Sequence, residues 1–131
     1  MAEANRGNRP LSPHLQIYRW QITMVVSILN RMTGVGMAVT AVLLVWWLVA
    51  AASSPGYFAL VDGILASWPG LLVLTVSLWG LWFHTLNGIR HLVWDSGRGF
   101  DLGTVTKSGW AVVAGSVVLT LLTLLVAGGG A

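Results

Sequence analysis

The strongest constraint on the fold is a set of three long stretches without a formally charged residue. They span residues 32–61, 63–89 and 108–131. An α-helix needs about 20 apolar residues to cross the hydrocarbon core of a bilayer, and each stretch exceeds that length. Because 56% of the residues are hydrophobic and only 8% are charged, the chain has too little polar surface for a soluble domain. We therefore expect an all-α integral membrane protein with three transmembrane helices.

Turn-forming segments give the expected bounds of these helices. Ser-Ser-Pro-Gly at 53–56 ends the first span, and the glycine-containing segment 95–103 separates the second from the third. The N-terminal segment 1–23 lacks the apolar core and cleavage site of a secretory signal, so we take the chain as mature from its start. We expect one transmembrane anchor domain over residues 1–131. Its predicted helices lie near 24–52, 63–92 and 106–128.

The positive charges predict the orientation in the membrane. All seven Lys and Arg residues fall on one side of the three predicted spans: Arg6, Arg9, Arg19, Arg31, Arg90, Arg98 and Lys107. By the positive-inside rule, the N-terminus is then cytoplasmic and the C-terminus is outside. The net charge of +3 therefore indicates a lipid bilayer as partner and no nucleic acid. The chain has no cysteine, which excludes disulfides, iron–sulfur ligation and thiolate metal sites within it.

A histidine lies in the middle of the second apolar stretch. His84 is one helical turn from both Gly80 and Gly88, and an imidazole in hydrocarbon is costly unless something binds it. One interpretation is a packed histidine that hydrogen-bonds to a neighbouring helix. The other is an axial ligand of a haem, for which the glycines leave room. Electron-transfer haems usually need two axial imidazoles, and one helix cannot supply both, so the second must come from another chain.

Further polar residues follow His84 toward the predicted cytoplasmic rim. Arg90 and His91 suit the propionates of a haem, or else they are interfacial charge anchors. Asp95 and Asp101 bracket the cytoplasmic loop. Such residues are commonly solvated charges or helix caps, and the functional alternative is a proton path from the cytoplasm.

A second polar group lies at the start of the first span. Ser27 and Arg31 are four residues apart and therefore share a helical face. Arg31 can extend to the lipid headgroups while Ser27 bonds a backbone carbonyl. Alternatively, the two side chains form a polar pocket that hydrogen-bonds the carbonyl of a lipid-soluble ligand and stabilises its reduced, anionic form.

Three segments together resemble a known family, the cytochrome b membrane-anchor subunit of succinate dehydrogenase (respiratory complex II). They are R-P-L-S-P-H-L-Q-I-Y at Arg9–Tyr18, S-I-L-N-R-M-T-G at Ser27–Gly34 and H-T-L-N-G-I-R-H-L-V-W-D at His84–Asp95. Their order and spacing fit the family, as does the three-span layout. The resemblance therefore covers most of the chain.

The resemblance implies a subunit of an enzyme complex in the bacterial cytoplasmic (inner) membrane. Such a subunit packs with a second three-helix anchor subunit and shares one haem b with it. The flavoprotein and iron–sulfur subunits dock on the cytoplasmic side, where the segment Arg9–Tyr18 is expected to meet them. Electrons then pass from the iron–sulfur subunit to ubiquinone, and this chain alone has no catalytic residue.

The resemblance also implies roles for individual residues. His84 corresponds to the axial haem ligand, and Ser27 and Arg31 correspond to the ubiquinone site. His91 and Arg31 fall where the family approaches the haem propionates. Asn30 stands where the family usually has a histidine near the haem propionates. An asparagine can still donate a hydrogen bond to a propionate, but it carries no charge.

Two other functions are consistent with parts of this pattern. The complex can run as a fumarate reductase that uses menaquinone, because the direction depends on the quinone and on the other subunits. The alternative of another class is a structural three-helix membrane protein without a cofactor. The first alternative keeps every residue assignment, whereas the second predicts no haem absorbance.

Overall fold

The computed structural model describes residues 7–14 and 16–130, and this part of the chain contains four α-helices. Three of them are long and apolar enough to cross a membrane, which confirms the predicted all-α membrane fold with three spans. Arg6 and the rest of residues 1–6 lie outside the described residues, as does Leu15. The helices are α1 (Ile22–Ser53), α2 (Pro55–Ala66), α3 (Trp68–Asp95) and α4 (Leu102–Gly129).

The second predicted span begins later than expected. We predicted a helix over 63–92, but residues up to Ala66 belong to the separate helix α2, and α3 starts at Trp68. The reason is a Ser-Trp-Pro-Gly sequence in which the Ser67 side chain accepts a hydrogen bond from the backbone N–H of Gly70 at 3.4 Å. Pro69 lies in the first turn of α3, where a missing N–H is tolerated, and it cannot continue the preceding helix.

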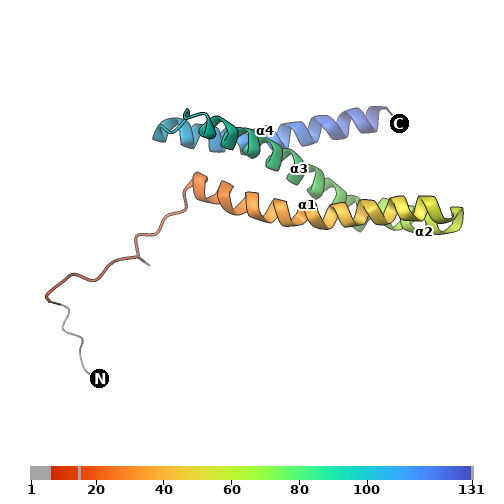
Figure 1. Ribbon diagram of the computed structural model, residues 1–131, viewed down its shortest axis with the longest axis horizontal. Helices are drawn as coiled ribbons and strands as arrows, with labels where there is room; N and C mark the ends of the chain where they lie inside the picture. The colour runs from red at the N-terminus through yellow and green to blue at the C-terminus, as the bar shows by residue number, and fades with distance from the viewer. Residues whose placement is uncertain (1–6, 15, 131) are drawn as a thin grey trace, which may run out of the picture.

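Helix α2 folds back along the second half of α1 (Figure 1). The indole Nε1 of Trp47 donates to the Asp62 carboxylate at 3.1 Å, and Nε1 of Trp46 donates to the Tyr57 hydroxyl at 2.6 Å. Ala50 is fully buried in this hairpin. The break at 53–56 was predicted, but the helical conformation of the segment that follows it was not.

Helix α3 lies between α1 and α4 and contacts both (Figure 1). The three spans meet at a small apolar core made of Val26, Phe83 and Val112. Within the most apolar window of each span, only 6% of α1, 11% of α3 and 17% of α4 is buried. The remaining apolar surface therefore faces lipid or further helices.

Polar side chains of α3 reach hydroxyl groups of α4. The Trp79 indole donates to Ser116 at 3.0 Å, and the Trp82 indole donates to Thr123 at 2.9 Å. Each hydroxyl in turn donates to a carbonyl oxygen of its own helix, three or four residues earlier. We call this arrangement an interhelical relay: a side-chain N–H, a hydroxyl on the neighbouring helix, and a carbonyl of that helix. It satisfies the indole and hydroxyl hydrogens of these residues where lipid offers no acceptor.

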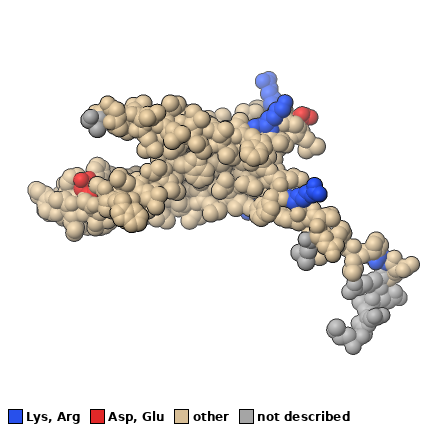
Figure 2. All heavy atoms as spheres, turned by 180° about the vertical axis from the view of Figure 1, so that it is seen from behind, with Lys and Arg blue, Asp and Glu red and all other residues tan. Residues whose placement is uncertain are grey.

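The basic side chains lie at one end of the bundle, and acidic side chains lie at both ends (Figure 2). Lys and Arg gather at the end where α1 begins and α3 ends, whereas Asp62 on α2 lies at the other end (Figure 2). The start of α1 and the end of α4 also lie at opposite ends (Figure 1). This distribution is consistent with the orientation that the positive-inside rule predicts.

The orientation can be tested because the chain contains no cysteine. Single cysteines at Ser12, Gly56 and Gly128 occupy exposed positions, and the two glycines have open space around them. A membrane-impermeant maleimide applied to intact spheroplasts should label Gly56→Cys and Gly128→Cys. Ser12→Cys should react only after permeabilisation. Labelling of Ser12→Cys before permeabilisation, with the other two protected, would contradict the predicted orientation.

Candidate functional site

His84 lies on α3 and is half-buried against α1. Its Nδ1 atom is 3.3 Å from the Thr33 hydroxyl oxygen. The ring edge rests on Gly34, where a Cβ atom would lie 3.4 Å from the imidazole Cε1. The Nε2 atom has no hydrogen-bond partner among the described residues. One ring nitrogen thus bonds the neighbouring helix, and the other remains available to a ligand.

The two glycines beside His84 have different surroundings. A Cβ atom on Gly80 would lie 3.5 Å from the Thr33 methyl group, so Gly80 serves the close approach of α1 and α3. A Cβ atom on Gly88 would meet nothing within 4 Å. The expectation that both glycines leave room for a cofactor is therefore wrong for Gly80, and the open surface lies on the Gly88 side of His84.

Three polar side chains of α1 lie at the end of the bundle where α1 begins and α3 ends. Ser27 and Arg31 are exposed and Asn30 is half-buried. None of these side chains makes a hydrogen bond or an ion pair with another described residue. Their helical face continues to Gly34, which touches the His84 ring. The polar groups of α1 and the imidazole of α3 therefore belong to one surface.

The antiparallel register of α1 and α3 sets the level of these groups. Thr40 of α1 donates to Ser77 of α3 at 2.7 Å. The next polar contact between these two helices, nearer the start of α1, joins Thr33 to His84. Continuing this register brings Ser27 level with the end of α3 that carries His91. Polar residues of both helices thus line the same end of the surface.

His91 is exposed, and a hydrogen bond to its own helix fixes the orientation of its ring. Its Nδ1 lies 2.9 Å from the Asn87 carbonyl oxygen, which can only accept, so Nδ1 carries the proton. The ring lies 5.0 Å from the Trp94 ring. His91 therefore remains available at the edge of the surface.

The two predicted proton-path residues are both exposed. Asp95 is the last residue of α3, and Asp101 occupies the N-cap position of α4 without a side-chain capping bond. Neither carboxylate makes a hydrogen bond or an ion pair with another described residue. Their positions are compatible with a solvated loop and with a proton path.

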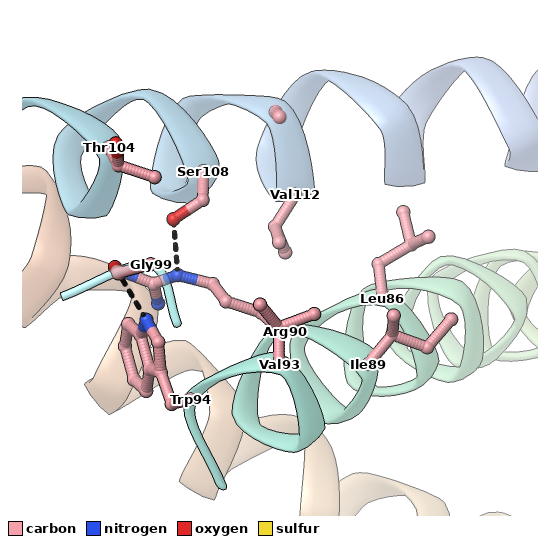
Figure 3. A pocket seen from close by; sticks show the side chains of 10 residues that line it. Leu86, Ile89, Arg90, Val93, Trp94, Gly99, Thr104, Ser108 and Val112 are labelled. Carbon is pink, nitrogen blue, oxygen red and sulfur yellow. Dashed lines mark hydrogen bonds between the residues drawn. The ribbon is translucent and has the colours of Figure 1, made fainter. Parts of the chain in front are cut away.

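Arg90 lies on a different face of α3 from the one we expected. It is only 7% exposed and points to α4 rather than to the side of His84 (Figure 3). Its guanidinium donates to the Ser108 hydroxyl at 2.9 Å, to the Val105 carbonyl oxygen at 3.1 Å and to the Asn87 side chain at 3.3 Å. The physical reason is the helical repeat, which places residues 84 and 90 about 120° apart around the axis.

The face of Trp94 covers the Arg90 guanidinium, at 4.2 Å from the ring centroid. Both residues line a groove of about 240 Å³ between α3 and α4 that is otherwise mostly apolar (Figure 3). The cation is thus held by neutral acceptors and an aromatic ring. We correct the assignment of Arg90 to the propionate side, because its contacts join α3 to α4.

Sequence analysis missed two residues that support these groups. Thr33 is 8% exposed and holds His84, and Asn87 is fully buried and holds Arg90. The Asn87 side-chain nitrogen has no hydrogen-bond partner. The clue was present in each motif, since a polar side chain inside an apolar span needs a partner on another helix.

The chain matches the family model described as "Succinate dehydrogenase/Fumarate reductase transmembrane subunit" over residues 5–123. The chain belongs to this family. It is 52% identical over 126 residues to the succinate dehydrogenase cytochrome b556 subunit of Paracoccus denitrificans, covering 96% of this chain and 97% of that protein. The b556 subunit of Rickettsia conorii is 44% identical over 117 residues, covering 88% and 90%.

A mitochondrial relative shows the same similarity at lower identity. The succinate dehydrogenase cytochrome b560 subunit of Sus scrofa is 36% identical over 123 residues, covering 91% of this chain and 68% of that protein. The predicted resemblance is thus confirmed, and the chain is a subunit of an enzyme complex. Family membership and the three spans also confirm a multi-pass membrane protein, and the bacterial relatives support the inner membrane as its location.

The Arg90 network predicts a local loss of stability when its donors are removed. Arg90→Met keeps the length of the side chain but leaves Ser108 and Asn87 without their donor. Hydrogen bonds to charged groups contribute about 1.5–3 kcal/mol, so we expect the free energy of unfolding to fall by about that amount. Thermal denaturation of the detergent-purified complex measures it.

Arg98→Met is the matched control, because Arg98 is exposed and its side chain has no partner among the described residues. Equal denaturation midpoints for the two variants would contradict the structural role of Arg90.

Proposed function

We propose that this chain is the cytochrome b membrane anchor of a succinate dehydrogenase, that it supplies one axial imidazole to a haem b, and that it binds ubiquinone at its cytoplasmic end. The observation that carries the proposal is His84, an intramembrane imidazole with one ring nitrogen engaged by α1 and the other unpaired. The relatives named cytochrome b support a haem of the b type.

His84 fits the haem on the residues present. Gly88 leaves open surface one turn away, and His91 marks the edge where propionates would be met. Asn30 replaces a charged contact at that edge with a neutral amide. Since the chain provides one imidazole, the second axial ligand comes from a second three-helix anchor subunit. When bound, the haem exchanges single electrons. The protein residues hold it between the two anchors.

Ser27 and Arg31 fit the quinone. Both side chains are exposed, have no partner among the described residues and lie where α1 begins. A hydroxyl and a guanidinium can each donate to a quinone carbonyl, and the positive charge of Arg31 favours the oxygen as it gains electron density. Asp95 and Asp101 lie at the same end, at the close of α3 and the start of α4, and would supply protons from the cytoplasm.

The exposed apolar surface of the spans supports partners beyond the bilayer. The second anchor covers the side of α1 and α3 that carries Gly34, His84 and Gly88. The iron–sulfur and flavoprotein subunits dock at the end rich in Lys and Arg, near the segment Arg9–Tyr18. Electrons reach the quinone from the iron–sulfur subunit, while this chain binds and orients the quinone.

The haem assignment predicts a specific loss in His84→Leu. The complex purified with this variant should lack bis-imidazole haem, because leucine offers no lone pair to iron. Haem content and the low-spin ferric EPR signal measure the effect. Trp79→Phe is a control in the same helix, since it removes a hydrogen bond to α4 without touching His84. An unchanged bis-imidazole spectrum in His84→Leu would overturn the assignment.

The quinone assignment predicts a selective kinetic defect. A hydrogen bond from a charged group is worth about 1.5–3 kcal/mol, so Arg31→Ala should slow quinone reduction by about 10- to 100-fold. Ser27→Ala should slow it by about two- to tenfold. Electron transfer from succinate to a water-soluble acceptor, measured on the same preparations, should stay at the wild-type rate.

Arg98→Ala and Ser53→Ala are matched controls at exposed positions, the first between α3 and α4 and the second at the far end of α1. Loss of quinone reduction in the controls, or equal loss with the soluble acceptor, would contradict the assignment of Ser27 and Arg31.

A fumarate reductase that uses menaquinone is the second candidate, because the family description names both activities. The relatives reported above are all named succinate dehydrogenase, which favours succinate oxidation. Extraction and identification of the quinone from the membranes that contain the complex would separate the two. The hypothesis of a structural protein of another class is dropped, because the chain belongs to the family of a redox complex.

A further inference from the structure

The contact of His84 with α1 has the form of an interhelical relay. The Thr33 hydroxyl lies 3.3 Å from Nδ1 of His84 and donates to the carbonyl oxygen of Asn30, three residues earlier, at 3.1 Å. A hydroxyl has a single proton. If that proton bonds Asn30, the oxygen must accept from His84, and Nδ1 then carries a hydrogen.

In three other contacts of α3, the direction of the hydrogen bonds is unambiguous, because the α3 side chain can only donate. An indole N–H and an arginine Nε–H can only donate. Trp79, Trp82 and Arg90 each donate to a hydroxyl on α4, and that hydroxyl donates to a carbonyl of α4 three or four residues earlier. In these three contacts the α4 hydroxyl thus gives its proton to its own helix and accepts from α3. The pair Thr33 and His84 repeats the same geometry on α1.

We propose that Thr33 is a positioning residue that holds His84 in the tautomer with hydrogen on Nδ1, leaving the lone pair of Nε2 for the haem iron. The proposal rests on the assignment of His84 as an axial ligand. A hydrogen bond from Nδ1–H to an acceptor also raises the basicity of the coordinating nitrogen. A more basic ligand stabilises oxidised iron, so the Thr33 hydroxyl lowers the midpoint potential of the haem.

Burial makes this contact a stable one. Thr33 is 8% exposed, and its methyl group packs against Gly80 of α3. The next residue, Gly34, has no side chain, so the imidazole packs directly against the backbone of α1. Rotation of the ring away from Thr33 would leave Nδ1–H without an acceptor in an apolar environment, which is unfavourable.

The test compares Thr33→Val, which keeps the shape but removes the hydroxyl, with Thr33→Ser, which restores the hydroxyl. In the purified complex, Thr33→Val should retain haem. At a fixed ambient potential, its ratio of reduced to oxidised haem should be about two- to tenfold higher. The g-values of the low-spin ferric EPR signal should shift with it. Thr33→Ser should match the wild type in both measurements.

Thr40→Val is the matched control on the same helix. It removes the hydrogen bond from Thr40 to Ser77 across the same helix pair without contacting His84, so it should leave the potential and the g-values unchanged. If Thr33→Val prevents assembly, Thr33→Ala removes the same hydroxyl with less bulk, and the same shift is expected. An equal shift in Thr40→Val would overturn the proposal, because it would show a general effect of helix packing.

The outcomes separate this inference from the proposed function. If His84→Leu loses bis-imidazole haem while Thr33→Val and Thr33→Ala keep the wild-type potential and g-values, the role of Thr33 is refuted and the ligand assignment stands. If His84→Leu retains an unchanged bis-imidazole haem, the ligand assignment itself fails, and the role of Thr33 fails with it.

Discussion

Polar hydrogens between membrane helices must find acceptors within the protein, because lipid offers none. In this bundle the middle helix α3 carries several of them, and hydroxyl groups of α4 accept them. Trp79, Trp82 and Arg90 bind α4 in this way, and His84 binds α1. The apolar core shared by the spans is small, so these contacts fix the rotation and register of α3 more specifically than apolar packing alone does. The placement of His84 follows from that register.

Helices α1 and α4 contact different sides of α3, and the polar residues on these two sides differ in their contacts. The side toward α4 carries Arg90, whose charge is held by neutral acceptors and by the face of Trp94. The side toward α1 carries His84, which keeps one nitrogen unpaired beside the open surface at Gly88. Arg90 and His91 are neighbours in the sequence, yet only His91 lies at the edge of the proposed site. The helical repeat therefore separates a structural cation from an imidazole of the proposed site one residue away.

The sequence was sufficient for the class, the three spans and the helical face shared by Ser27 and Arg31, because uncharged length and helical spacing determine all of these. It was insufficient for α2, since a Ser-X-Pro turn inside an apolar stretch does not change its hydropathy. It was also insufficient for Arg90, because its direction depends on the hydroxyls that α4 presents, and that contact is made between helices rather than along one. The role of Gly80 was hidden for the same reason, as its space is filled by Thr33 of another helix.

These features make the chain one half of a site. Its unpaired groups, Ser27, Arg31 and Nε2 of His84, all belong to a surface that has no covering element among the described residues. We propose that a second anchor completes that surface and that a haem b would be held between the two. The most direct measurement is a reduced-minus-oxidised visible spectrum of the detergent-purified complex that contains this chain. We expect the sharp α-band of a low-spin b-type haem, and a difference spectrum without a haem band would contradict the haem assignment.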